Sequence, residues 1–245
     1  MNTQDIIKAL ERTDGSFPGK EITAAREQKN EIIPALLELL KNTVRNIDQV
    51  RSEENYFAYI YAMFLLAEFR EKRALNTIVD LLSLPGETTW ELIGDIMTED
   101  LGRILASVSC GECAGLEKLI ENEDLDELVR AAAIDAMLIL LVKEELPRED
   151  LITYFRSLYQ SRLKKEGSLV WNHLVVSSIN IYPEELLEQI KEAYLQELAD
   201  EEFIPYQYVE DALLSGKETV LGWLENNPDY SLVTDSISDI GRWLS

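Results

Sequence analysis

The feature that most constrains this chain is the spacing of its apolar residues, which recur three and four positions apart and almost nowhere alternate. This period lines up apolar side chains on one face of an α-helix, whereas a half-buried strand needs strict alternation. Short breaks rich in Gly, Pro, Asp, Asn and Glu separate the apolar runs. The sequence therefore predicts an all-α fold. We expect helices at about 3–12, 22–45, 53–71, 73–84, 88–96, 99–109, 113–121, 125–144, 148–164, 168–180, 184–199, 206–215, 218–226 and 231–243.

The expected helices fall into adjacent pairs, and two of the pairs match each other in sequence. When the segment from Ala132 is laid over the segment from Ser168, Pro147 meets Pro183 and the following acids also coincide, which is a shift of 36 residues. A proline followed by acids suits the first turn of a helix, because proline lacks the N–H and acids favour the positive end of the helix dipole. This shift lies within the range of helix-pair repeats.

The segment 58–85 has the same organisation, with a long apolar helix, a basic break and an amphipathic helix closed by Pro85. We interpret the pairs as HEAT-like repeats in an α-α superhelix, a right-handed solenoid of about six pairs that forms a single domain over 1–245. A soft boundary is expected near 122–126, and 205–245 are expected to be C-terminal capping helices in which Trp223 and Trp243 help close the end. The alternative is an irregular helical bundle.

The stretch "WELIGDIMTEDLGRILASV" (90–108) follows the helix pair "YFAYIYAMFLLAEFREKRALNTIVDLLSLPGE". Together they resemble an uncharacterised bacterial family, a domain of unknown function with HEAT-like helices, and the likeness covers about residues 1–210. Members of that family often carry a cysteine-rich SEC-C zinc tail, similar to one that contacts partner proteins in a secretion ATPase. The tail is absent here, so the resemblance implies neither its partner binding nor any catalytic residues.

The charge of the chain restricts its partners. The sequence has 46 acidic and 23 basic residues, a formal net charge of -23. Such a chain repels nucleic-acid phosphates and anionic lipid, so we expect no direct nucleic acid and no membrane among its partners. The start of the chain lacks the pattern of a signal peptide, and we expect a cytoplasmic location.

The only two cysteines lie in "SCGEC", as Cys110 and Cys113. A C-x-x-C spacing permits a redox disulfide or two metal ligands, and a cysteine at a helix N-terminus has a lowered pKa. It also fits a corner between two helices, with Gly111 in the left-handed position that ends the first helix and Cys113 opening the second. Glu112 opposes a thiolate, and a zinc site needs two more ligands, so we favour the structural corner and predict no cofactor.

His173 is the only histidine, and it lies in the apolar stretch "SLVWNHLVVSSI". We expect a buried or half-buried histidine that hydrogen-bonds to a neighbour, in preference to a catalytic base. A serine triad would have to include His173, and the sequence has no G-x-S-x-G elbow. No catalytic residue is predicted.

The aromatic stretch "NYFAYIYAMFLLAEF" covers more than one face of its helix. These side chains either pack on both neighbouring helices, which we favour, or line an exposed groove. If a groove exists, its first candidates are Tyr56, Tyr59, Trp90, Trp171 and His173.

Three functions follow as hypotheses. The first is a non-catalytic scaffold or adaptor whose acidic surface holds a protein partner, with a basic partner favoured by charge. The second is a thiol redox or metal-binding factor that uses Cys110 and Cys113. The third is an acidic nucleic-acid mimic that inhibits a nucleic-acid-binding protein. The sequence does not predict the oligomeric state.

Overall fold

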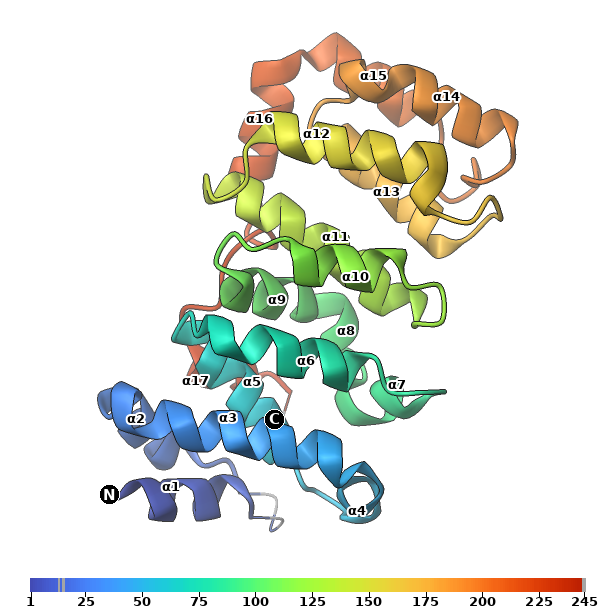
Figure 1. Ribbon diagram of the computed structural model, residues 1–245. Coiled ribbons are helices and arrows are strands. Elements are labelled where there is room, and N and C mark those ends of the chain that lie inside the picture. Colours follow the sequence, from blue (N-terminus) through green and yellow to red (C-terminus); the bar gives the residue numbers. More distant parts are fainter. Residues whose placement is uncertain (13, 15, 244–245) are drawn as a thin grey trace. The chain divides into compact units, whose positions relative to one another are not determined.

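The computed structural model describes residues 1–12, 14 and 16–243. Every regular element in these residues is a helix, so the predicted all-α class is confirmed (Figure 1). Two short 3-10 turns, η1 (Lys72–Ala74) and η3 (Pro183–Leu186), and one π-helical turn, η2 (Leu158–Arg162), accompany the α-helices. The α-helices are α1 (Thr3–Leu10), α2 (Gly19–Glu27), α3 (Lys29–Arg45), α4 (Ile47–Ser52), α5 (Ala58–Glu68), α6 (Leu75–Leu82), α7 (Thr88–Ile93), α8 (Ile96–Glu99), α9 (Leu101–Ser109), α10 (Ala114–Glu121), α11 (Glu127–Val142), α12 (Arg148–Ser157), α13 (Leu169–Asn180), α14 (Leu187–Leu195), α15 (Gln207–Ser215), α16 (Lys217–Asn226) and α17 (Ser236–Gly241).

Polar side chains at the N-termini explain where several helices begin. Asn2 caps α1, since its side-chain oxygen accepts the N–H of Asp5 at 2.9 Å. Asp126 caps α11 by accepting the N–H of Leu128 at 2.8 Å. Each cap satisfies a donor that the first helical turn leaves without an intrahelical partner.

One expected helix is divided in the structure. The range 22–45 holds two helices, because Gln28 leaves the helical conformation with φ -112° and ψ 35°. Its N–H ends α2 by donating to Ala24 O at 3.2 Å, and its carbonyl begins α3 by accepting the N–H of Ile32 at 3.0 Å. Glutamine is an ordinary helix residue, so the sequence carries no local sign of this break.

The C-termini of several helices share a left-handed turn. After α11, the N–H of Glu144 donates to Leu141 O at 3.0 Å, and the N–H of Glu145 donates to Leu140 O at 2.9 Å. This pair of bonds is a Schellman motif, which requires positive φ at the residue after the cap. Glu144 has φ 59° although it is not glycine. Positive φ also occurs at the ends of α5, α9, α13 and α14, at Arg70, Cys110, Tyr182 and Glu197.

The described chain divides into two compact units. The first contains Met1–Ile96, Ser107–Cys110 and the segment from Leu232 onward, and the second contains Met97–Ala106 and Gly111–Ser231. Residues 122–126, where a soft boundary is expected, lie inside the second unit. Of the expected C-terminal helices, α15 and α16 belong to the second unit and α17 to the first.

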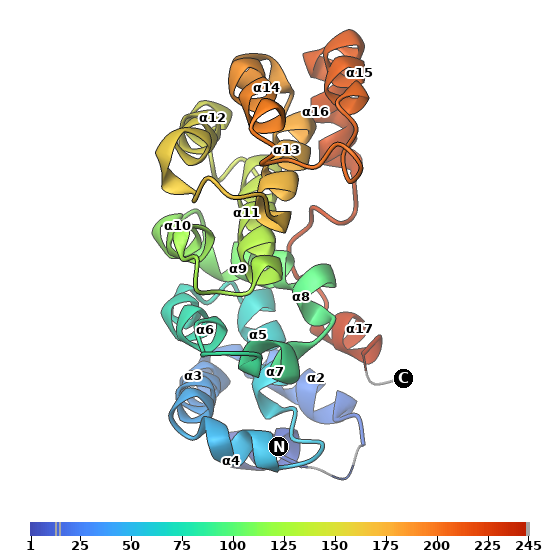
Figure 2. The same cartoon turned by 90° about the vertical axis from the view of Figure 1, so that its right-hand side faces the viewer.

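In the first unit, α5 is the central helix, and it contacts α2, α3 and α17 (Figure 2). All its residues from Ala58 to Ala67 are buried, so this part of the aromatic stretch packs against neighbours on every side, as expected, whereas Tyr56 and Phe57 before it are half-buried. The C-terminal segment is held there by polar contacts as well. Glu68 accepts the backbone N–H of Ser236 at 2.9 Å, and Arg26 forms ion pairs with Glu68 at 2.7 Å and Asp235 at 3.3 Å.

In the second unit, each long apolar helix packs on the next. Helix α11 contacts α10 and α13, and α13 contacts α15 and α16. Gly102 of α9 allows a close approach to α11, since a Cβ there would lie 3.1 Å from Asp135 Cβ and 3.2 Å from Ala132 O. No helix of the described residues has the length and apolar character needed to cross a bilayer.

Candidate functional site

Cys110 and Cys113 lie at the corner between α9 and α10. Cys110 ends α9 with φ 49°, and Gly111 follows with φ 84°. Cys113 is the N-cap residue of α10, as the sequence predicts, and its thiol lies 3.7 Å from Gly111 O. A Cβ on Gly111 would lie 3.2 Å from Glu145 O, so a larger residue here would need a small shift of the corner after α11.

The contacts of the two thiols are those of a structural corner. The Cys110 thiol donates to Arg70 O and Ser107 O, both at 3.4 Å, and so contacts the corner that ends α5. Burial, followed by the carboxylates of Glu117 and Asp150, raises the pKa of Cys113. A raised pKa lowers the thiolate fraction at neutral pH, which is opposite to what a redox nucleophile or a metal ligand needs. Both cysteines are free thiols, and the described residues contain no cluster of three or more His, Cys, Asp or Glu suited to a metal ion.

His173 pairs with Asp135 across α13 and α11. Its Nε2 lies 2.9 Å from Asp135 Oδ1, and the two side chains are 26% and 30% exposed. The histidine is thus half-buried and hydrogen-bonded to a neighbouring helix, as the sequence predicts. This hydrogen bond joins α13 to α11, so the pair is an interhelical contact.

The candidate groove residues fall in different units and differ in exposure. Tyr56, Tyr59 and Trp90 belong to the first unit, whereas Trp171 and His173 belong to the second. Tyr59 is buried and donates its hydroxyl to Leu92 O at 2.8 Å, and Trp171 is buried and donates Nε1 to Lys164 O at 2.9 Å. Trp90 is 45% exposed.

Tyr56 lines a polar pocket of about 370 Å³ beside α3 and α4. Burial, with the carboxylates of Glu11 and Glu53, raises the pKa of Tyr56 to about 12. Burial and Glu53 also raise the pKa of Glu11. The pocket is therefore a local concentration of negative charge, with amide side chains of Asn42, Asn46 and Gln49 along its wall.

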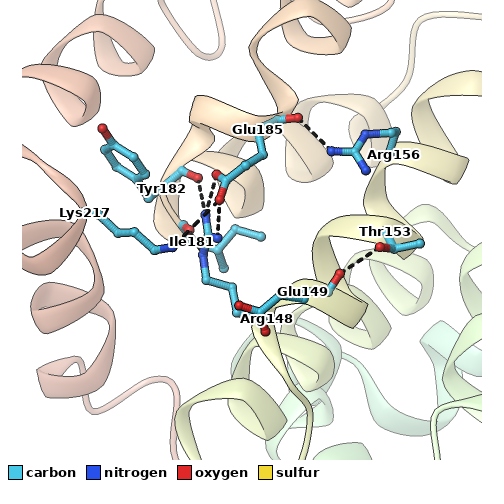
Figure 3. A network of polar contacts seen from close by, with 8 residues as sticks. All are labelled: Arg148, Glu149, Thr153, Arg156, Ile181, Tyr182, Glu185 and Lys217. Carbon is cyan, nitrogen blue, oxygen red and sulfur yellow. Dashed lines mark hydrogen bonds and ion pairs between the residues drawn. The ribbon is translucent and has the colours of Figure 1, made fainter.

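The most extensive polar network that sequence reasoning missed surrounds Arg148 at the start of α12 (Figure 3). The side chain is 9% exposed and reaches the corner after α13. Its Nε donates to Ile181 O at 2.8 Å, and Nη2 donates to Tyr182 O at 2.9 Å. The guanidinium also forms a two-pronged pair with Glu185, at 2.6 and 2.7 Å. Arg148 thus satisfies two carbonyls that the end of α13 leaves open.

Glu185 is held as a carboxylate by this network. The hydrogen bonds from Arg148 lower the pKa of Glu185 to about 2, and Lys217 lies 3.8 Å away. Arg156 donates to the backbone carbonyl of Glu185 at 3.0 Å. The four residues join α12, η3 and α16, so the network stabilises packing between successive helices of the second unit.

Sequence reasoning also missed the exposed aromatic residues of α15 and α16. Trp223 is 61% exposed and Tyr208 56% exposed, so the expectation that Trp223 helps close the end of the fold is wrong. The reason is local, because Val220 and Leu224 fill the buried stripe of α16 and turn Trp223 outward. Both aromatic residues line a pocket of about 210 Å³. The spacing of Trp223 between Val220 and Leu224 was the available signal.

Comparisons with known proteins agree with the resemblance drawn from the sequence. The chain is 35% identical over 245 residues to a protein of Chlamydia trachomatis described as an uncharacterized protein, covering 100% of this chain and 96% of the relative. It is 34% identical over 245 residues to an uncharacterized protein of Chlamydia muridarum, covering 97% of that relative. No solved structure matches the chain. A family model described as a protein of unknown function (DUF1186) matches residues 1–245 in full, so the chain belongs to this bacterial family.

Proposed function

We propose that this chain is a non-catalytic scaffold that binds a basic protein partner through an acidic surface. The observation that carries the proposal is the excess of 46 acidic over 23 basic residues. Such a field attracts basic segments and speeds their association, and it repels nucleic acid. It weakens when salt screens exposed charges, with a screening length of about 10 Å at 0.1 M.

The packing of the helices supports a HEAT-like arrangement as part of this proposal. In the second unit α11 is buried nearly all round and contacts α10 and α13, which is how an inner helix of a repeat array packs. The corners of successive pairs touch, as Arg148 and the carbonyls of Ile181 and Tyr182 do. Repeat arrays of this kind present long surfaces for protein binding.

Large apolar side chains on the outside of the helices favour protein contact over an inert surface. Several large apolar side chains are exposed, and aromatic residues of this kind are enriched at protein interfaces: Trp90, Phe203, Tyr208, Leu214 and Trp223.

We further propose a cytoplasmic setting, since the chain keeps Cys110 and Cys113 as free thiols.

The test is a titration with two labelled peptides of about 15 residues that have opposite net charge and the same apolar residues, followed by fluorescence anisotropy. We expect the basic peptide to bind and its Kd to rise at least tenfold between about 50 and about 500 mM salt, because screening shortens the range of the attraction. An unrelated acidic protein of matched net charge is the control for non-specific attraction. Equal affinity for both peptides, or binding no tighter than to the control protein, would contradict the proposal.

A further inference from the structure

The pocket beside Trp223 lies wholly within the second unit. Its lining residues come mainly from α13, α15 and α16, helices whose ribbons Figure 2 shows. Three aromatic residues form part of its wall: Tyr208 of α15, Trp223 of α16 and Tyr230. The Tyr230 ring is fixed, since its hydroxyl accepts Asn180 Nδ2 at 3.0 Å. Ile179, Ala212, Val220 and Leu224 supply an apolar floor.

The pocket also carries negative charge. Asp211 is in its wall, exposed, with one carboxylate oxygen accepting Gln207 Nε2 at 2.9 Å. None of the described residues that line the pocket is basic. Burial and the carboxylates of Asp135 and Asp229 raise the pKa of Tyr230, which marks a negative field at that wall. Aromatic rings around an acid with no basic lining residue favour a cation.

The size of the pocket limits what enters it. Sites for drug-sized molecules usually measure about 300–1,000 Å³, and this pocket measures about 210 Å³. It therefore suits a single side chain better than a free small molecule. Arginine has an apolar stem for the floor, a planar cation that stacks on aromatic rings, and paired donors for a carboxylate.

Another tryptophan of this chain, Trp171, forms a cation–π contact with a lysine of the chain itself. Lys165 Nζ lies over the Trp171 ring, 4.8 Å from its centroid, in the second unit. Within the part of the chain that the structure describes, no cation lies over Trp223, which remains 61% exposed. The ring of Trp223 is thus accessible to a cation from a partner, whereas the ring of Trp171 already has Lys165 over it.

We propose that the pocket formed by Tyr208, Asp211, Trp223 and Tyr230 binds an arginine side chain from a basic segment of a partner protein. The guanidinium stacks on the exposed aromatic rings and pairs with Asp211, while its stem covers the apolar floor. This inference rests on the proposed function and names the part of the surface that recognises the partner.

In the experiment, N-acetyl-arginine amide is titrated into the whole chain, whose tryptophan side chains are ¹⁵N-labelled. The NMR signals of the indole N–H groups are followed. The chain has four tryptophans, and the variant Trp223→Phe identifies the indole signal of Trp223. We expect that signal to shift in a saturable way at millimolar ligand, whereas Trp90, the matched exposed tryptophan, stays unshifted. Asp211→Asn should weaken binding about three- to tenfold, since an exposed ion pair with paired hydrogen bonds contributes modestly. N-acetyl-glutamate amide is the negative control.

The variants also separate this inference from the proposed function. The basic peptide used above is titrated into the wild type, Asp211→Asn, Trp223→Ala and Trp90→Ala. Loss of affinity in the two pocket variants and not in Trp90→Ala supports the pocket. Undiminished binding of the peptide by both pocket variants, or a shift of all exposed tryptophans alike, overturns the pocket and leaves the acidic scaffold standing. No binding of the peptide by the wild type overturns both.

Discussion

At the scale of single residues, several helix ends adopt a left-handed backbone at residues other than glycine. A left-handed conformation costs an L-residue about 1–2 kcal/mol, because its Cβ approaches the backbone. Arg70, Cys110, Glu144 and Tyr182 accept this cost at the corners that follow α5, α9, α11 and α13. The corner hydrogen bonds and the contacts between corners offset the strain.

Replacing Glu144 by glycine should therefore stabilise the fold. Glu144→Gly is expected to raise the free energy of unfolding by up to about 1 kcal/mol, since glycine adopts φ 59° without strain. The matched control is Lys143→Gly, where the ordinary φ of -90° gives glycine no such advantage and a loss of up to about 1 kcal/mol is expected. Urea unfolding of both variants measures the difference, and equal losses in the two would contradict the strain.

The thiols give a second prediction at this scale. Cys113 has a raised pKa, so less of it is thiolate at a given pH and it should react slowly with iodoacetamide. In the variant Cys110→Ser, which leaves Cys113 alone, the midpoint of the alkylation rate should lie at higher pH than for an unstructured cysteine peptide. Fast alkylation well below pH 8 would instead revive the redox hypothesis.

At the scale of elements, the start of α12 is joined to the corner after α13 by one buried side chain. Arg148→Met keeps the length and apolar stem of the residue and removes the donors to Ile181 O, Tyr182 O and Glu185. The free energy of unfolding should fall by about 2–4 kcal/mol, because two carbonyls and a carboxylate lose their charged partner. Arg156→Met is the control, with one bond to a backbone carbonyl and an expected loss below about 1 kcal/mol. Similar losses measured by urea unfolding in both variants would show that the network contributes little.

The same network should make the free energy of unfolding depend on pH. Glu185 has a pKa lowered from 4.5 to about 2 in the folded chain, so its contribution is fully present above about pH 4.5 and is lost as pH falls toward about 2. Compared with Glu185→Gln, the wild type should be more stable at pH 7, and the difference should shrink steadily below pH 4.5. Denaturant unfolding at several pH values measures it, and a difference that stays constant with pH would rule out this role for Glu185.

Whether an element can be predicted from the sequence depends on whether the interactions that form it are local in the chain. The all-α class and most helix positions follow from the spacing of apolar residues three and four positions apart, which is a local property of the sequence. The division of 22–45 does not, because Gln28 leaves the helical conformation, with φ -112° and ψ 35°, although it is neither glycine nor proline. The Arg148 network also has no local sign, since the packing of α12 against η3 brings Arg148 and Glu185 together.

The candidate sites differ in the same way. The corner role of Cys110 and Cys113 could be inferred from Gly111 and the helix spacing, and the pairing of His173 with a neighbour from its apolar helix. The partner Asp135 could not be named, because it comes from another helix. The spacing of Trp223 between Val220 and Leu224 indicates that its side chain points outward, but the pocket beside it could not be predicted, because its lining comes mainly from three helices that only the fold brings together.

At the scale of the whole molecule, we propose that this strongly acidic chain captures a basic protein. The most direct measurement is capture from a native lysate on tagged protein at about 50 and about 500 mM salt, with the bound proteins identified by mass spectrometry and an unrelated acidic protein as bait control. We expect a basic protein that is enriched at the lower salt and lost at the higher, because screening removes the long-range attraction. Partners that are retained equally at both salts, or none beyond those of the control bait, would contradict it.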